Sequence, residues 1–181
     1  MQDKFGLAQG GRREDLRFLK GEGRYVADLV PAGALYAAFL RAPVAPARLA
    51  ALDLTAARAL PGVELVWALP DLEAAGVKPA MRGYRVNGPD GQPGAGPERP
   101  VLARDVVRFA GELIACVVAT SAAAARDGVE AIVADLEDLP VKTDLAPGGP
   151  LLHPEAPENI GYRFALGDAE AVEQAFARAA R

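Results

Sequence analysis

The only cysteine and the only histidine of this sequence, Cys116 and His153, are residue types from which a thiol nucleophile and its general base are built. Such a pair needs an exposed thiol, but the residues that flank Cys116 in segment 114–118 are all apolar and predict that it is buried in a strand. One cysteine and one histidine also fall short of the four ligands of a structural zinc site. We therefore interpret Cys116 as a core residue and expect no metal to be bound by this chain.

A second group that could perform acid–base chemistry is the carboxylate cluster Asp135, Glu137 and Asp138. The alternation of a strand places Asp135 and Glu137 on the same face, which is typical of a solvent-facing edge. The glycine-rich segment 81–91 neither follows a predicted strand nor opens a helix, so it does not indicate a phosphate-binding loop. The sequence contains no GxGxxG, GxxxxGK[ST], HExxH or GxSxG motif. These residues therefore predict no catalytic site of their own.

Composition narrows the possible classes of protein further. The chain has 181 residues, of which 51% are hydrophobic and 24% charged, which is enough for a single domain with a real core. Its net charge of −4 and scattered basic residues argue against a nucleic-acid partner. No apolar run reaches the roughly 18 residues of a membrane helix, and no secretory signal begins the chain. We expect a cytoplasmic protein without a membrane or nucleic-acid partner.

The pattern of apolar residues predicts strands and short helices in alternation. Strands are expected where bulky and β-branched residues alternate, at 25–29, 35–41, 48–54, 63–68, 105–109, 113–119 and 132–137. Helices are expected at 12–19, at 56–60 after an N-cap at Thr55, at 71–75, after a Thr120–Ser121 cap, and from an N-cap at Asp168. The last helix carries an apolar stripe of Val172, Ala175, Phe176 and Ala179.

Two stretches, 76–100 and 144–159, have no period and are predicted to be long irregular loops. Eleven of the 25 residues in 76–100 are Gly or Pro. Loops of this length are usually functional or dock a partner. A floppy surface insertion explains the composition equally well, so both interpretations stay open.

Six segments, taken in order, resemble one protein family. They are REDLRFLKGEGRYVADL (13–29), FLRAPVAPARLAALDLTAARALPGV (39–63), LARDVVRFAGELIACVVATS (102–121), IVADLEDLPVKTD (132–144), LLHPEAPENI (151–160) and GDAEAVEQAFARA (167–179). Together they are similar to the N-terminal domain of the molybdopterin-binding large subunit in the xanthine dehydrogenase, aldehyde oxidase and aerobic carbon monoxide dehydrogenase family.

The resemblance implies an α+β fold, the α/β hammerhead, with a mixed β-sheet, packed helices and two long irregular loops. It implies the hammerhead domain at 12–166 and a helix at 167–181 that leads towards the molybdopterin-binding domains, whereas the polar, Gly-rich composition of 1–11 predicts a flexible segment. The family oxidises or hydroxylates substrates at a molybdenum centre, with water as the oxygen source, and passes electrons to iron–sulfur and flavin subunits or domains. We expect this chain to bind no cofactor itself and to pack on the molybdopterin-binding domains and the iron–sulfur partner.

The sequence departs from the family at two places that the resemblance marks as interface or turn positions. The first begins at Arg41 and Pro43, where the two histidines that the family carries after this point are absent. The second is the turn at Gly111 and Glu112, which lacks the family's following proline. The family's catalytic glutamate belongs to a segment outside these residues, so Glu112 is assigned to the turn and no catalytic residue is predicted.

Three functions are compatible with these observations. The first is a scaffold within a molybdenum hydroxylase, with 76–100 and 144–159 as candidate contact loops. The second is a stand-alone, non-enzymatic binding module that kept the hammerhead fold. The third, a carrier domain, needs a lysine exposed at a hairpin tip, and none of Lys4, Lys20, Lys78 and Lys142 has that context.

Overall fold

The structure is a computed structural model that describes residues 14–179, and the chain divides at Ala34/Leu35 into two compact units. The predicted flexible segment 1–11 lies outside the described residues. In the first unit, helix α1 (Asp15–Leu19) is followed by a 3-10 helical turn at Val26–Asp28. The rings of Phe18 and Tyr25 stack with centroids 5.7 Å apart and join these two elements.

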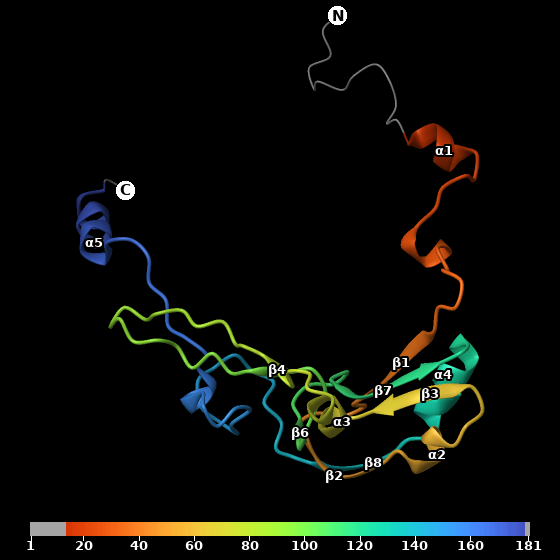
Figure 1. The fold of residues 1–181 in the computed structure, drawn as a ribbon. Coiled ribbons are helices and arrows are strands. Elements are labelled where there is room, and N and C mark those ends of the chain that lie inside the picture. The colour runs from red at the N-terminus through yellow and green to blue at the C-terminus, as the bar shows by residue number, and fades with distance from the viewer. Residues whose placement is uncertain (1–13, 180–181) are drawn as a thin grey trace, which may run out of the picture. The chain divides into compact units, whose positions relative to one another are not determined.

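The second unit begins with an antiparallel sheet in the order β1 (Tyr36–Arg41), β7 (Leu113–Ala119) and β3 (Val63–Trp67). Helix α4 (Ala122–Glu130) begins at Ser121, whose hydroxyl oxygen accepts the Ala124 N–H at 3.1 Å. The helix packs across all three strands, as Figure 1 shows. Gly128 allows this close approach, because a Cβ there would lie 2.6 Å from Val117 Cγ1.

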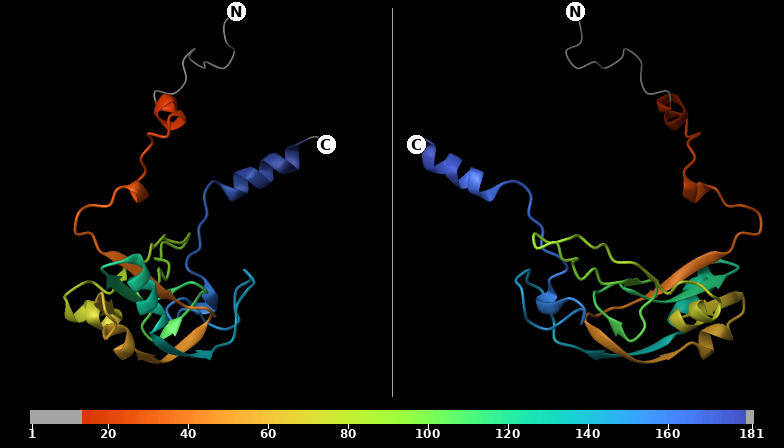
Figure 2. Two further views of the ribbon diagram at one scale, coloured as in Figure 1. Left: turned by 90° about the vertical axis from the view of Figure 1, so that its right-hand side faces the viewer. Right: turned by 60° about the vertical axis from the view of Figure 1, so that its left-hand side comes forward.

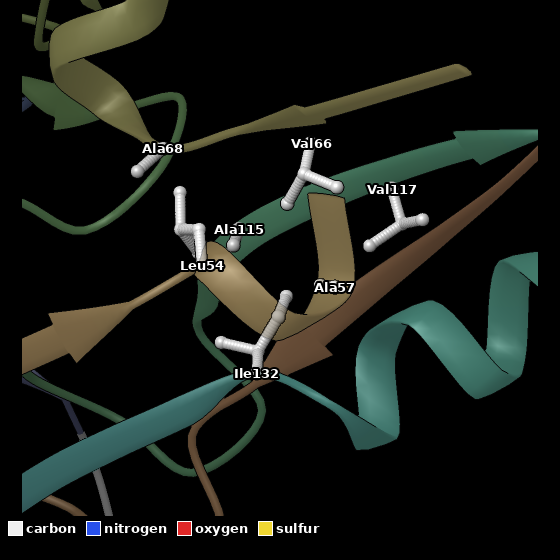
Figure 3. Close-up of a cluster of buried hydrophobic side chains, with 7 residues drawn as sticks. All are labelled: Leu54, Ala57, Val66, Ala68, Ala115, Val117 and Ile132. Atoms are coloured by element: carbon white, nitrogen blue, oxygen red, sulfur yellow. The ribbon is translucent and has the colours of Figure 1, made fainter. Parts of the chain in front are cut away.

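A second antiparallel sheet has the order β6 (Val106–Val107), β2 (Ala47–Asp53) and β8 (Val133–Asp138). Two short helices, α2 (Thr55–Arg58) and α3 (Leu69–Ala74), flank β3 in the chain. The buried residues between α2 and the first sheet form one cluster, drawn in Figure 3: Leu54, Ala57, Val66, Ala68, Ala115, Val117 and Ile132. A second buried cluster joins the sheets through Ala42, Ala47, Ala103, Val107 and Ile114.

Segment 76–100 folds back on itself as a long hairpin, which corrects the prediction of a wholly irregular loop. Strands β4 (Ala80–Met81) and β5 (Arg99–Pro100) pair antiparallel at its base, and Asn87 and Pro93 form a bridge near its tip. Both views of Figure 2 show its two arms running together. Gly and Pro residues obscure this pairing in the sequence because they leave no alternation of apolar side chains.

The stretch 144–159, predicted to be irregular, has no helix or strand up to residue 156 and ends in a 3-10 turn at Pro157–Asn159. An extended stretch leads on to helix α5 (Ala169–Arg178). The predicted N-cap is confirmed, since Asp168 Oδ1 accepts the Ala171 N–H at 2.9 Å. No residue of α5 is buried, and its apolar stripe is exposed.

Three local predictions were wrong. Residues 25–29 form no strand, because Asp28 Oδ2 accepts the Tyr25 N–H at 2.9 Å and closes a helical turn instead. The strand expected at 105–109 is only Val106–Val107, since Arg108 turns away to other partners. Thr55 lies inside α2 rather than capping it, and the Asp53 carboxylate accepts the Thr55 N–H at 2.8 Å.

The expected α+β class is confirmed. Where the resemblance implied a mixed sheet, every strand pairing in the part of the chain that the structure describes is antiparallel. Within the same residues, no helix is long and apolar enough to cross a membrane.

Candidate interface around the Gly111–Glu112 turn

The tight turn before β7 is held against the end of β1. Gly111 has φ +90°, a left-handed conformation that side chains with a Cβ rarely adopt. Its N–H donates to the Ala42 carbonyl at 2.8 Å, and the Ala42 N–H donates to the Glu112 carbonyl at 2.9 Å. Arg41 Nη1 donates to the Gly111 carbonyl at 2.9 Å. The structure therefore brings together Arg41, Gly111 and Glu112, and Pro43 lies exposed just beyond Arg41 in the chain.

Glu112 is the one charged residue with a fully buried position among those described, at 7% exposure. Its Oε2 accepts the backbone N–H of Arg108, and its own N–H donates to the Phe109 carbonyl at 3.1 Å. A buried carboxylate needs such partners, since an unpaired one costs several kcal/mol. The Glu112 side chain thus closes the 108–112 loop on itself, in agreement with its assignment to the turn.

Arg108 extends this turn to a loop far away in the sequence. Its Nε donates to the Leu152 carbonyl at 2.9 Å. That loop is in turn organised by Asn159, whose Nδ2 donates to the carbonyls of Gly148 and Pro150 and whose Oδ1 accepts the Leu152 N–H. The Asn159 amide therefore fixes the segment that Arg108 contacts.

His153 is positioned by these contacts beside charged groups. Its Nδ1 lies 3.6 Å from Glu155 Oε1. Partial burial, followed by the nearby Arg108 guanidinium, lowers the pKa of His153 below its ordinary value. The ring is therefore mostly neutral at pH 7. It lines an open hollow of about 320 Å³ together with Arg104, Arg108 and Glu155.

Cys116 lies elsewhere and is half-buried, which corrects the expectation of full burial. Val117 faces α4, so strand alternation turns Cys116 to the opposite face of the sheet, which is only partly covered. Burial raises the pKa of its thiol, which disfavours the reactive thiolate. Among the described residues no hydrogen bond joins Cys116 and His153, so nothing brings the two together as a nucleophile and base.

The carboxylates of β8 form a solvent-facing edge, as predicted. Asp135, Glu137 and Asp138 are all exposed, and Glu137 pairs with Arg48 on the neighbouring strand. Across residues 14–179 no three His, Cys, Asp or Glu side chains come together in a way that could hold a metal ion. The geometry is thus that of a structural turn held by the side chains of Arg41, Arg108, Glu112 and Asn159, which we call its clamps.

Sequence reasoning missed Arg108 and Asn159, although both lie inside segments that carried the resemblance. Their partners are 44 residues away for Arg108 and 7 to 11 residues away for Asn159. No spacing rule connects an arginine with a distant backbone carbonyl. The Gly-Glu pair before an apolar strand was the only available signal for this site.

The model of the aldehyde oxidase and xanthine dehydrogenase a/b hammerhead domain matches residues 20–140. The chain belongs to this family. The hammerhead chain is 39% identical, over 175 residues, to the large subunit of nicotine 6-hydroxylase from Paenarthrobacter nicotinovorans. It is 34% identical to the carbon monoxide dehydrogenase large chain of Afipia carboxidovorans. Both alignments cover 93% of this chain, which spans only about a fifth of either relative.

Solved structures agree with this assignment. The hammerhead chain superposes on the Cu,Mo-CO dehydrogenase in its carbon monoxide reduced state with a TM-score of 0.74 and 31% identity, covering 94% of this chain and 22% of that one. It superposes on quinoline 2-oxidoreductase from Pseudomonas putida 86 with a TM-score of 0.64 and 42% identity, covering 77% and 16%. The resemblance seen in the sequence is therefore confirmed, and the chain is a domain of the molybdenum hydroxylase large-subunit family.

Proposed function

We propose that this hammerhead chain serves as a scaffold in the large subunit of a molybdenum hydroxylase. In this role it supports the molybdopterin-binding domains and docks the iron–sulfur partner, with turns and clamps in place of catalytic residues. The parent enzyme would oxidise or hydroxylate its substrate with water as the oxygen source and pass electrons on through iron–sulfur and flavin groups.

The observation that supports a scaffold role most strongly is the bare apolar face of α5. This helix has 10 residues and buries none of them, and Phe176 on its apolar stripe is 75% exposed. Isolated helices shorter than about 12–15 residues are marginal in water. Helical stability in proteins comes mainly from packing of such a face. The stripe is therefore suited to packing against another part of the enzyme.

The described residues contain no group of side chains that could act together as ligands of a metal ion. Between residues 14 and 179, no three His, Cys, Asp or Glu side chains converge, and no buried side-chain polar atom is left without a hydrogen-bond partner. A cofactor site normally offers several convergent polar groups. This supports the proposal that the molybdenum cofactor is held by other parts of the enzyme, and no chemical step is assigned to the described side chains.

The experiment compares Phe176→Ser with Glu173→Ser in the full-length large subunit expressed with its partner subunits. Both substitutions lie on α5 and introduce the same side chain, Phe176→Ser on the apolar stripe and Glu173→Ser outside it. Truncating a buried Phe costs about 3–5 kcal/mol, so Phe176→Ser should lower the yield of assembled enzyme and its melting temperature. Glu173→Ser should change the yield of assembled enzyme and its melting temperature only slightly. Molybdenum per subunit and turnover per molybdenum complete the measurement.

A scaffold role predicts that turnover per molybdenum stays unchanged in whatever enzyme assembles. Equal behaviour of the two variants would show that the stripe is not covered. A stable, molybdenum-loaded Phe176→Ser enzyme with lost turnover would show that the domain takes part in the chemistry. A wild-type protein that purifies alone and without molybdenum would favour the stand-alone module.

A further inference from the structure

The hairpin 76–100 concentrates the unsatisfied positive charge of its unit. Between Arg41 and Arg178, all arginines but four have a hydrogen bond or ion pair with another residue. The exceptions are Arg82, Arg85 and Arg99 in the hairpin, and Arg126 on α4. The hairpin carries four basic residues against two acidic ones, in a chain whose net charge is −4. An acidic protein thus presents a local basic surface here.

The backbone of the hairpin that carries these arginines is held in place by close contacts and hydrogen bonds. Its arms cross so closely that a Cβ on Gly83 would lie 2.1 Å from the Gly96 carbonyl oxygen. The Gly94 N–H donates to the Val86 carbonyl, and the Ala95 N–H to the Gly161 carbonyl, both at 2.8 Å. The hairpin is thus tied across its width and to the segment that leads to α5. Such preorganisation lowers the entropy cost of docking.

An exposed aromatic residue lies in the sequence between two of these unpaired arginines. Tyr84 is 76% exposed and separates Arg82 from Arg85 in the sequence. Tyr and Arg are the residue types most enriched where binding energy concentrates in protein interfaces. Unpaired guanidinium groups next to an exposed aromatic residue in the sequence call for a partner that offers both carboxylates and apolar surface. Arg82 and Arg85 also line one hollow of the hairpin, together with Glu98.

We propose that the hairpin docks through Tyr84, Arg82 and Arg85 onto an apolar surface rimmed by carboxylates in the remaining part of the large subunit. This inference rests on the proposed function. The relatives carry about four fifths of their length outside the matched part. A partner in the same polypeptide is held at about millimolar effective concentration, which suits a contact made by one hairpin. Tyr162 and Phe164, which follow the Gly161 that is bonded to the hairpin, are exposed as well.

The test places the photocrosslinking residue benzoylphenylalanine at position 84 of the full-length large subunit, in the enzyme assembled with its partners. Mass spectrometry then identifies the peptide that is captured. We expect cross-links to a segment of the same polypeptide outside residues 1–181 that carries Asp or Glu beside apolar residues. Arg82→Glu combined with Arg85→Glu should reduce the cross-linked fraction at least about tenfold, which corresponds to about 1.4 kcal/mol.

Arg126→Glu is the matched control, because Arg126 is also exposed and unpaired but lies on α4. It should leave the cross-linked fraction unchanged. Capture of a different subunit, capture of a basic segment, or an equal yield in the charge-reversed and control variants would overturn the proposal. The molybdenum content of the wild-type enzyme distinguishes failure of the hairpin contact from failure of the proposed function. If molybdenum is present and one of these results is found, only the hairpin contact is rejected. If molybdenum is absent, the proposed function is rejected.

Discussion

Gly111→Ala isolates the backbone requirement of the turn at the centre of the candidate interface. A Cβ built on Gly111 meets no atom within 4 Å, so the substitution creates no clash. Its cost comes only from φ +90°, where a residue with a Cβ loses about 1–2 kcal/mol. The same residue donates to Ala42 and accepts from Arg41, so relaxation of the turn would also strain these two bonds.

Gly161→Ala provides the matched control. Its Cβ also meets nothing within 4 Å, but its φ is not positive. Such a replacement stabilises by about 0.4–1 kcal/mol through the unfolded chain. The two variants should therefore differ by about 2 kcal/mol in the free energy of unfolding. For a chain of this size that is a difference of about 4–8 °C in melting temperature.

The assay is thermal and urea unfolding of the 181-residue chain, followed by circular dichroism. Gly111→Asn should fall between Gly111→Ala and the wild type, because Asn tolerates the left-handed region better than Ala. If Gly111→Ala and Gly161→Ala unfold alike, the turn does not need its left-handed residue and the account of this site is wrong.

Three further predictions concern the clamps around this turn. Glu112→Gln keeps an oxygen facing the Arg108 N–H but removes the charge, so it should lower the free energy of unfolding by about 1 kcal/mol. Turnover per molybdenum in the full enzyme should stay unchanged. Lost turnover with unchanged stability would make Glu112 catalytic. Asn159→Ala strips three backbone groups of their partner and should cost about 1–3 kcal/mol in urea unfolding, whereas the exposed Asn87→Ala should stay within about 0.5 kcal/mol; equal effects would refute the role of Asn159. The lowered pKa of His153 means that the unfolded chain takes up its proton first as the pH falls. The stability that the neutral ring contributes is therefore complete above about pH 6.5 and is lost as the pH falls towards the folded-state pKa. His153→Gln should flatten the dependence of the melting temperature on pH in this range, and a proton NMR titration that places this pKa above 6.5 would contradict the assignment.

The strands of the two main sheets could be predicted because their side chains alternate or form short apolar runs. Strands β1, β2, β3, β7 and β8 all lie where the sequence indicated them, within one or two residues. The sequence did not show which face of each strand is buried. Val66 is in the core, whereas Val63 and Trp67 on the same strand are only half-buried. Burial of a face depends on what packs there, and one strand does not carry that information.

The hairpin and the clamps could not be predicted for a different physical reason. They are held by backbone carbonyls and N–H groups, which every residue possesses. The Gly94 to Val86 and Arg108 to Leu152 hydrogen bonds leave no trace in side-chain type or period. Gly111 was found because only a residue without a Cβ suits its conformation, and such a requirement is visible in the sequence.

The central claim is that the apolar surfaces left bare here are covered by the rest of a large subunit. Hydrogen exchange of the α5 amides in the complete enzyme tests it most directly. A 10-residue helix with nothing packed on it opens constantly, so its amides would exchange nearly as fast as those of an unfolded peptide. We expect the amides of residues 172–178 to be protected at least about a hundredfold, which corresponds to about 2.7 kcal/mol of local stability. Exchange at the rate of an unfolded peptide would contradict the account.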